Sequence, residues 1–203
     1  MIKKLLYIVA LIVLAVTIYS LNSGGPDKAY RQKVANVRAE RIRYLKNAKE
    51  SPFQQFEIKY QPLEFFPINE SFKVRANLER IANPQRVMIP SSDDSSEPYI
   101  KFAYATFKLN GQPLKLLILK PAGFGALPNV YFTAFADDTS GESTYGGGRY
   151  LDLEIGKSDN IEIDFNLAYN PYCAYAKEYS CPLPPAENIL PIAITAGEKD
   201  FPH

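Results

Sequence analysis

The chain has 203 residues, with 23 basic against 22 acidic side chains and a formal net charge of +1. This balance supplies no general field for nucleic acid, so we expect no nucleic-acid partner. The one histidine is the last residue, His203, which excludes most schemes with an imidazole base and most histidine-rich zinc sites.

The first predicted element is an uncharged apolar segment at residues 5–21, which follows Lys3 and Lys4. Its 17 residues are at the short end of what spans a bilayer. Bulky Ile18 and Leu21 stand where a signal peptidase prefers small residues, so we favour an uncleaved anchor over a cleaved signal peptide. Residues 1–25 are therefore assigned to a signal anchor or transmembrane segment.

The same segment leads us to expect a single-pass protein of a bacterial cell membrane, with an extracytoplasmic domain. Basic residues after the segment favour the opposite orientation under the positive-inside rule. We give more weight to the short Lys-Lys start, which is typical of exported chains.

A helix is predicted over residues 28–49, because apolar residues recur at near-helical spacing until Ser51-Pro52 ends the pattern. Residues 39–43 are mostly charged, which favours the solvated face of an amphipathic helix. A membrane-surface or partner-binding helix is the alternative. We assign residues 26–50 to a helical connector.

From residue 51 onward the hydrophobic period approaches two, which indicates β structure. Asn110-Gly111 lies between two alternating runs and predicts a hairpin turn. Residues 51–203 are expected to form a single mainly β domain, either an antiparallel sandwich or a partly closed barrel, preceded by the transmembrane helix and the amphipathic helix. Strands are predicted at residues 71–78, 86–89, 99–109, 114–120, 130–136, 150–154, 160–165 and 190–195.

Three dense polar and aromatic blocks follow, at residues 135–151, 164–175 and 181–188, on turn-rich backbone of the kind that carries sites. In the first block three glycines precede Arg149, a pattern that could cradle a phosphate. A phosphate loop needs a following helix, whereas residues 150–154 alternate like a strand. The favoured interpretation is a tight turn in which Arg149 pairs with Asp137 or Asp164.

The acidic side chains of this region could in principle form an oxygen cage for Ca²⁺ or Mg²⁺. Their spacing is not that of an EF-hand, and they lie on separate predicted elements, which favours turn capping or ion pairing. We therefore predict neither a metal nor a cofactor. The acids considered are Asp137, Asp138, Glu142, Asp152 and Asp164.

Cys173 and Cys181 are the two cysteines of the chain, too far apart for a CxxC motif. In an exported domain they would form a disulfide worth roughly 2–3 kcal/mol, and in a cytoplasmic domain they would stay reduced. We predict the disulfide. The prolines at residues 182–185 stiffen the following loop, which could form a pocket wall or a plug over the core.

The three blocks, together with Ala196-Gly197-Glu198-Lys199, resemble the signature of the uncharacterised family DUF1684. The resemblance covers residues 135–199 closely and the region from Arg38 to Pro67 more loosely. It implies no reaction and marks only the motif positions. These are Asp137, Thr139, Thr144, Tyr145, Arg149, Asp164, Asn166, Tyr169, Asn170, Cys173, Cys181, Glu187, Asn188, Glu198 and Lys199.

Three functions are compatible with these residues. The first is a module that binds a small ligand or an envelope component, with Arg149 and Lys199 as anion contacts and tyrosines as walls. The second is a hydrolase or isomerase, and the third is a buried polar network that binds nothing. The ligand-binding candidates are Tyr145, Arg149, Asn166, Tyr169, Asn170 and Lys199.

For the enzyme hypothesis, the candidate acids and bases are Asp137, Asp164 and Glu198, with Arg149 stabilising developing negative charge. Whether the chain is an enzyme stays open at this point. The hypotheses differ in one structural respect, which is whether these side chains meet at an open cavity or satisfy one another in the interior.

Overall fold

The computed structural model describes residues 26–122 and 130–202. The chain divides into two compact units between Val37 and Arg38. The predicted membrane segment, residues 5–21, lies outside the described residues. Among the residues that are described, no helix is long and apolar enough to cross a membrane.

In the described part of the chain, two α-helices precede the strands. The predicted helix over residues 28–49 is present as α2 (Pro26–Asn47). In the first unit, its exposed Asp27 and Arg31 form an ion pair at 2.7 Å, four residues apart as the helical repeat allows. In the second unit, α3 (Pro52–Gln55) starts at Ser51, whose hydroxyl accepts a hydrogen bond from the Gln54 backbone N–H at 3.3 Å.

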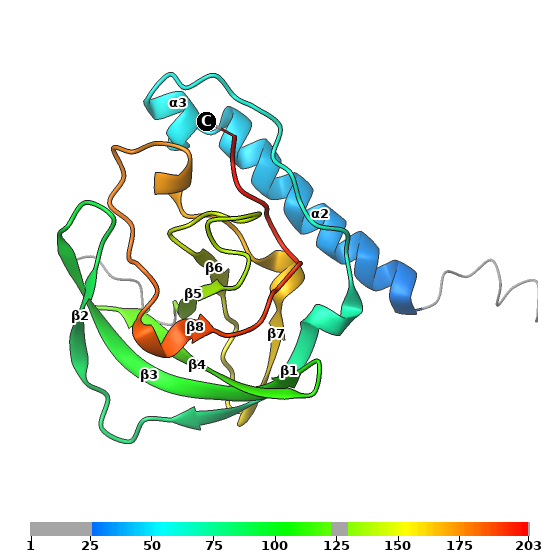
Figure 1. The fold of residues 1–203 in the computed structure, drawn as a ribbon, viewed down its shortest axis with the longest axis vertical. Coiled ribbons are helices and arrows are strands. Elements are labelled where there is room, and N and C mark those ends of the chain that lie inside the picture. Colours follow the sequence, from blue (N-terminus) through cyan, green and yellow to red (C-terminus); the bar gives the residue numbers. More distant parts are fainter. Residues whose placement is uncertain (1–25, 123–129, 203) are drawn as a thin grey trace, which may run out of the picture. The chain divides into compact units, whose positions relative to one another are not determined.

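The second unit is built on one curled sheet, in the order β6-β5-β4-β3-β1-β7. β2 pairs with β3, and β8 pairs with β5 as a parallel strand, whereas the other pairs are antiparallel. Figure 1 shows β3 and β4 curving around the elements that they enclose. The structure confirms the mainly β class and has the partly closed form, not the sandwich. The strands are β1 (Lys73–Arg80), β2 (Arg86–Pro90), β3 (Ser96–Leu109), β4 (Gln112–Pro121), β5 (Phe132–Asp137), β6 (Arg149–Asp152), β7 (Asn160–Asp164) and β8 (Ile189–Leu190).

The predicted hairpin is confirmed between β3 and β4. Leu109 pairs with Gln112, and the two residues between them have positive φ, 50° at Asn110 and 81° at Gly111. This is the conformation of a two-residue turn whose twist matches that of the flanking strands.

The core lies where the two longest strands present alternate residues to the interior. In β3, Ala103, Ala105, Phe107 and Leu109 are buried, and every second residue between them is more exposed. Phe165 packs against this face, with its ring centroid 5.8 Å from that of Phe107. Phe165 belongs to η2 (Phe165–Leu167), one of the short helical turns on the interior side of the sheet. The others in the described residues are η1 (Glu70–Phe72), η3 (Tyr172–Ala174) and η4 (Ala186–Asn188).

The proline-rich loop ends in a plug between β4 and β5. These two strands pair at Leu119 and Phe132. Beyond that point the buried Asn188 side chain lies between them: its amide nitrogen donates to Leu117 O at 2.9 Å and Ala134 O at 2.8 Å, and its oxygen accepts from Leu117 N at 2.6 Å. One side chain thus replaces backbone pairing where the strands diverge, because buried backbone groups need partners.

The last predicted strand is mostly wrong. Residues 190–195 were expected to be extended and paired, yet β8 ends at Leu190. Downstream, the carbonyls of Ile194 and Ala196 accept hydrogen bonds from the Arg149 guanidinium, and the Ile194 N–H donates to Asp137 Oδ1 at 3.2 Å. An arginine and an aspartate therefore satisfy groups that a neighbouring strand would otherwise pair.

Candidate functional site

The first candidate group is a buried ion pair. Asp137 ends β5, and Arg149 begins β6 after a glycine turn in which Gly148 has φ of 84°. Arg149 Nη2 lies 2.7 Å from Asp137 Oδ2, and both side chains have no exposed surface. The turn interpretation of the glycines and the predicted pairing of Arg149 with Asp137 agree with this arrangement.

The Arg149 guanidinium makes its remaining hydrogen bonds to backbone carbonyls, and it lies over the Phe135 ring, 5.3 Å from the ring centroid. Besides Ile194 and Ala196, Nη1 reaches Glu198 O at 3.4 Å, and Nε is buried without a hydrogen-bond partner among the described residues. Burial lowers the pKa of Arg149, and the charge of Asp137 opposes that shift. A guanidinium enclosed in this way holds the C-terminal segment in place but offers no surface to a ligand.

Glu198 is the centre of a second buried group. Its carboxylate accepts from Asn170 Nδ2 at 3.2 Å and from the Tyr175 hydroxyl, and Arg41 Nε lies 3.3 Å away. Burial raises the pKa of Glu198, while Arg41, Tyr175 and the Asn170 N–H oppose the rise. Glu198 is 1% exposed, so its contacts are internal.

Three other predicted residues lie outside these groups. Asp164 caps η2, with Oδ1 accepting from the Asn166 N–H at 3.0 Å, and Asn166 in turn holds the backbone of Asn69 through both amide atoms. Lys199 lies 3.5 Å from the Glu64 carboxylate. These contacts join segments of the chain, and the residues do not meet Arg149 at one open site.

The structure corrects the prediction made for the two cysteines. Cys173 and Cys181 are both buried free thiols, so the predicted disulfide is absent. The Cys173 N–H donates to Cys181 Sγ at 3.2 Å, and the Tyr145 hydroxyl donates to Cys173 Sγ at 3.6 Å. The hydrogen bond from Cys181 lowers the pKa of Cys173 to about 6. Sequence separation alone did not reveal that these sulfurs are engaged as hydrogen-bonding groups.

An open hollow lies beside the second buried group, with a volume of about 420 Å³. Of the predicted ligand-binding residues, Tyr169 lines it. The full lining is Arg41, Tyr150, Asp152, Tyr169, Pro171, Tyr172, Tyr179, Ser180, Cys181 and Pro182. We call it the tyrosine pocket.

Arg41 connects this pocket with the interior. Its guanidinium carbon lies 4.2 Å from the centroid of the Tyr169 ring, and Nη2 donates to Asn170 O at 2.7 Å. Burial alone would lower the pKa of Arg41, but proximity to Tyr175 and Glu198 outweighs it, so the pKa is raised. The guanidinium is charged and held in a fixed orientation.

Arg41 was missed because its helical stretch was assigned to solvent. That assignment holds for Glu40 and Arg43, which are exposed, and is wrong for Arg41, whose side chain is 20% exposed. Arg38 departs from it in the same way, since its guanidinium donates to Phe66 O at 2.9 Å and to Asn166 O at 3.0 Å. The spacing of Arg38 and Arg41, one helical turn apart on the same face of the helix, was the sequence signal that could have identified both residues.

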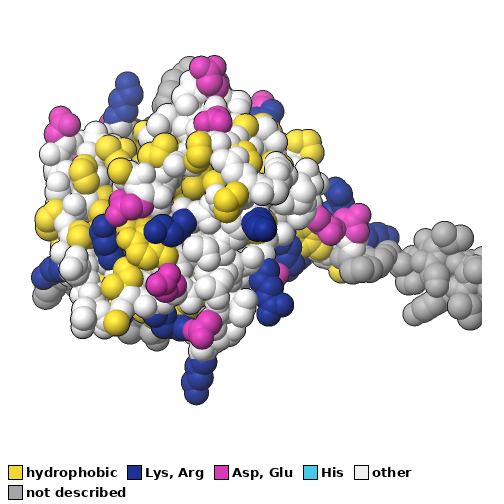
Figure 2. Space-filling view, turned by 60° about the horizontal axis from the view of Figure 1, so that its bottom comes forward, with side chains coloured by type: hydrophobic (Ala, Val, Ile, Leu, Met, Phe, Trp, Pro, Cys, Tyr) yellow, Lys and Arg dark blue, Asp and Glu magenta, His cyan; other side chains and the backbone are white. Residues whose placement is uncertain are grey.

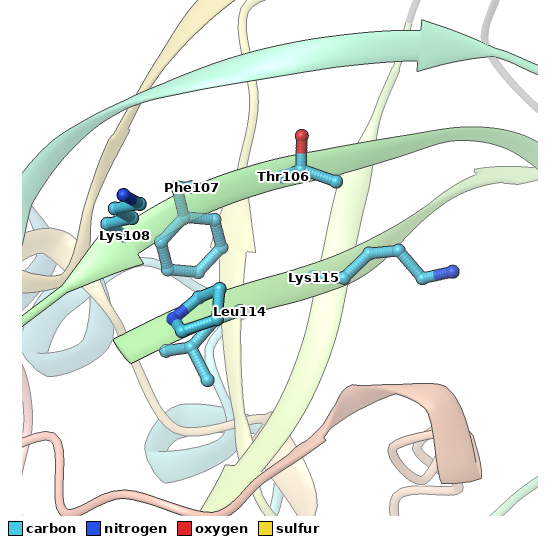
Figure 3. A pocket seen from close by; sticks show the side chains of 6 residues that line it. Thr106, Phe107, Lys108, Leu114 and Lys115 are labelled. Atoms are coloured by element: carbon cyan, nitrogen blue, oxygen red, sulfur yellow. The ribbon is translucent and has the colours of Figure 1, made fainter. Parts of the chain in front are cut away.

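Two further hollows have weaker chemistry. Figure 3 shows one at the β3–β4 hairpin, about 510 Å³ in volume, where Lys108 and Lys115 lie at opposite ends of the labelled group. The other, about 440 Å³, lies between β2 and the proline-rich loop and includes Lys101 and Glu187, which pair with each other. In neither do several polar groups converge, as they do around Tyr169.

Basic and acidic side chains are mixed on one face of the molecule. Figure 2 shows Lys and Arg side chains interspersed with Asp and Glu on one face, with hydrophobic groups between them. Within residues 26–122 and 130–202, no group of three or more His, Cys, Asp or Glu side chains could hold a metal ion. Asp137, Asp152 and Asp164, which were considered for an oxygen cage, take part in three separate groups of contacts.

Fold and site together define a mainly β half-barrel domain with a buried ionic interior and an open tyrosine-walled hollow. The chain belongs to the family described as "Protein of unknown function (DUF1684)", whose model matches residues 58–199. The resemblance seen in the three blocks is thereby confirmed.

A solved structure supports the same fold. The solution NMR structure of the uncharacterized protein from gene locus rrnAC0354 of Haloarcula marismortui is 32% identical in sequence, with a TM-score of 0.66. The similarity covers 85% of this chain and 95% of that one. Among curated proteins, none matches this chain.

Proposed function

We propose that this protein is a binding module for a small molecule, and that the tyrosine pocket is where the ligand sits. The observation that carries the proposal is the convergence of four tyrosines, Arg41 and Asp152 on a hollow of about 420 Å³. Ligand sites are typically concave, between about 300 and 1,000 Å³, and lined by apolar or aromatic groups with a few placed polar ones.

The buried residues have a supporting role in this proposal. Glu198 and Asn170 O hold Arg41, and Arg149 with Asp137 holds the segment that carries Glu198. Arg149 and Glu198 have 0% and 1% exposure, so neither reaches a ligand in this arrangement. Carboxylate acid-base catalysis by these residues is therefore not part of the proposal, and the arginine that lines the pocket is Arg41.

We further propose that residues 5–21 anchor the chain in a bacterial cell membrane, with the pocket on the extracytoplasmic side. The support is the uncharged apolar run after a Lys-Lys start. A topology reporter fused after His203 should be active outside the cytoplasm, and activity confined to the cytoplasm would contradict the orientation.

The pocket is tested with a panel of small uncharged sugars, aromatic carboxylates and organic amines, by ligand-observed NMR on the full-length chain. Ser180 lies at the pocket and is half-buried, so Ser180→Trp should fill the hollow and abolish binding. The matched control is Lys115→Trp at the hairpin hollow, which should leave binding unchanged.

Circular dichroism and thermal unfolding establish that both variants are folded. If Ser180→Trp does not fold, chemical-shift mapping of the wild-type chain replaces it, and the shifts should gather around Tyr169 and Tyr172. The proposal fails if no compound binds, or if binding survives Ser180→Trp and maps elsewhere.

A further inference from the structure

We propose that the tyrosine pocket binds a small organic ammonium ion, such as a methylated amine, in contact with the tyrosine rings and Asp152. This inference rests on the proposed function and names its ligand class. It follows from three properties of the pocket, which are its hydrogen-bonding capacity, its charge and its aromatic surface.

The hydroxyl protons of the four tyrosines are already used. Tyr150 donates to Pro182 O at 2.6 Å, Tyr169 to Asp152 Oδ1 at 2.9 Å, Tyr172 to the Tyr44 hydroxyl at 3.3 Å, and Tyr179 to Gln55 Oε1. A tyrosine hydroxyl has one proton to donate and keeps lone pairs that accept. Towards a ligand, these hydroxyls are therefore acceptors.

The hydroxyls also remain protonated near neutral pH. Burial is the largest cause that raises the pKa of each of the four tyrosines above its ordinary value. The walls thus present neutral rings and oxygen lone pairs, which suits a ligand that brings hydrogen-bond donors.

Arg41 adds little capacity for an anion. Nε and Nη2 contact Glu198, Asn170 and Tyr175, which leaves Nη1 without a hydrogen-bond partner among the described residues. Glu198, 3.3 Å from Nε, balances the charge of the guanidinium. An anionic ligand would meet one free donor group and a charge that is already compensated.

Asp152 is the uncompensated charge of the pocket. Its Oδ1 accepts from Tyr169, no ion pair to it is found in the described part of the chain, and its side chain is exposed. Burial of a cation without a counter-ion costs free energy, and the Asp152 carboxylate supplies that counter-ion at the rim of the pocket. The charge of the lining therefore favours a positively charged ligand over a neutral or negative one.

The aromatic walls attract cations through their ring faces. The protein uses this attraction itself, since the Arg41 guanidinium lies over Tyr169 at 4.2 Å from the ring centroid. Tyr172 and Tyr179 form an edge-on pair with centroids 5.1 Å apart, which places two more rings in the same lining. Aromatic groups beside a carboxylate are the usual recognition chemistry for quaternary ammonium ions.

The test compares choline with dimethylbutanol, its uncharged carbon analogue, by calorimetric titration of the full-length chain. The two probes have nearly the same shape, so a difference in affinity reports the positive charge. We expect choline to bind at least about tenfold more tightly, with the difference shrinking at high salt.

The matched variants remove one negative charge inside and outside the pocket. Asp152→Asn should weaken choline binding by about fivefold or more and leave dimethylbutanol unchanged. Asp138→Asn, at an exposed acid that does not line the pocket, should change neither.

The outcomes separate this inference from the proposed function. If sugars or carboxylates bind in the pocket while choline does not, or if choline and dimethylbutanol bind equally, the ammonium inference is overturned and the binding module stands. If no member of the wider panel binds, both are overturned.

Discussion

Two arginines of this protein have similar hydrogen-bonding partners but differ in their exposure to a ligand. Arg149 and Arg41 each face a carboxylate, at 2.7 Å from Asp137 and 3.3 Å from Glu198, and each donates to at least one backbone carbonyl. Arg149 is wholly enclosed, whereas Arg41 keeps 20% of its side chain exposed at the rim of an aromatic hollow. The difference in burial therefore separates an arginine that holds the backbone in place from one that is available to a ligand.

The largest expected effect comes from breaking the enclosed pair. Arg149→Met leaves the Asp137 carboxylate buried without its counter-ion and removes the donors to Ile194 and Ala196. Loss of one partner of a buried pair typically costs about 3–5 kcal/mol. Urea unfolding should show a loss of this size or no folded protein. An unchanged unfolding free energy would contradict the supporting role of Arg149.

Two glycine substitutions test how closely the C-terminal segment held by Arg149 is packed. Gly197 has φ of 78°, and a Cβ there would lie 2.7 Å from Ala168 O and 2.8 Å from Phe165 O. Gly197→Ala should cost about 2–5 kcal/mol, because a positive-φ penalty adds to a clash with backbone. The control is Gly111→Ala, where φ is 81° and no atom lies within 4 Å, with about 1–2 kcal/mol expected. Equal losses in thermal unfolding would show that the C-terminal segment is not closely packed.

A smaller effect, with a pH signature, is expected at Glu198. Because burial raises its pKa, the folded protein keeps a proton that the unfolded chain has released. The contribution of this group to the free energy of unfolding therefore falls as pH rises from the unfolded pKa towards the folded one.

Glu198→Gln removes that titration and should cost about 1–3 kcal/mol, because both carboxylate oxygens accept hydrogen bonds and the substitution replaces one of them with an amide nitrogen that donates. Urea unfolding between about pH 4 and 8 should show the wild-type advantage shrinking as pH rises. A wild-type advantage that grows with pH would mean that Arg41 dominates and that the carboxylate is stabilised in its charged form.

The smallest stability effect is expected at the pocket rim. Asp152 is exposed, and its one hydrogen bond comes from Tyr169, so Asp152→Asn should change the free energy of unfolding by about 0.5 kcal/mol or less. The same measurement that detects the loss in Arg149→Met should detect almost none here. A loss of several kcal/mol would place Asp152 in the structural network.

Local sequence patterns predicted the strands well where a strand pairs with the next strand in the sequence. Asn110-Gly111 carries its own turn conformation, and the alternation in β3 is visible along one strand. The pairing of Arg149 with Asp137 was also accessible, because both residues lie in one short block. In these cases the interacting residues lie close together in the sequence.

The pocket could not be predicted in the same way because its residues come from distant segments. The hydrogen bond from Arg41 to Asn170 O joins residues 129 positions apart. Likewise, the disulfide was predicted from the expected export of the domain and the spacing of the two cysteines, whereas both are free thiols in the structure. Residues 190–195 were read as a strand because sequence does not show that side chains of Asp137 and Arg149 satisfy that backbone.

The central claim is that the open tyrosine pocket, and not the enclosed Arg149 group, is where a ligand binds. The most direct measurement is an NMR titration of the isotopically labelled full-length chain with choline. We expect shifts concentrated at Asp152, Tyr169, Tyr172 and Cys181, with the signals of Asp137 and Arg149 unchanged. Shifts centred on Asp137 and Arg149 would contradict this claim, and so would the absence of shifts with choline and with every compound of the wider panel.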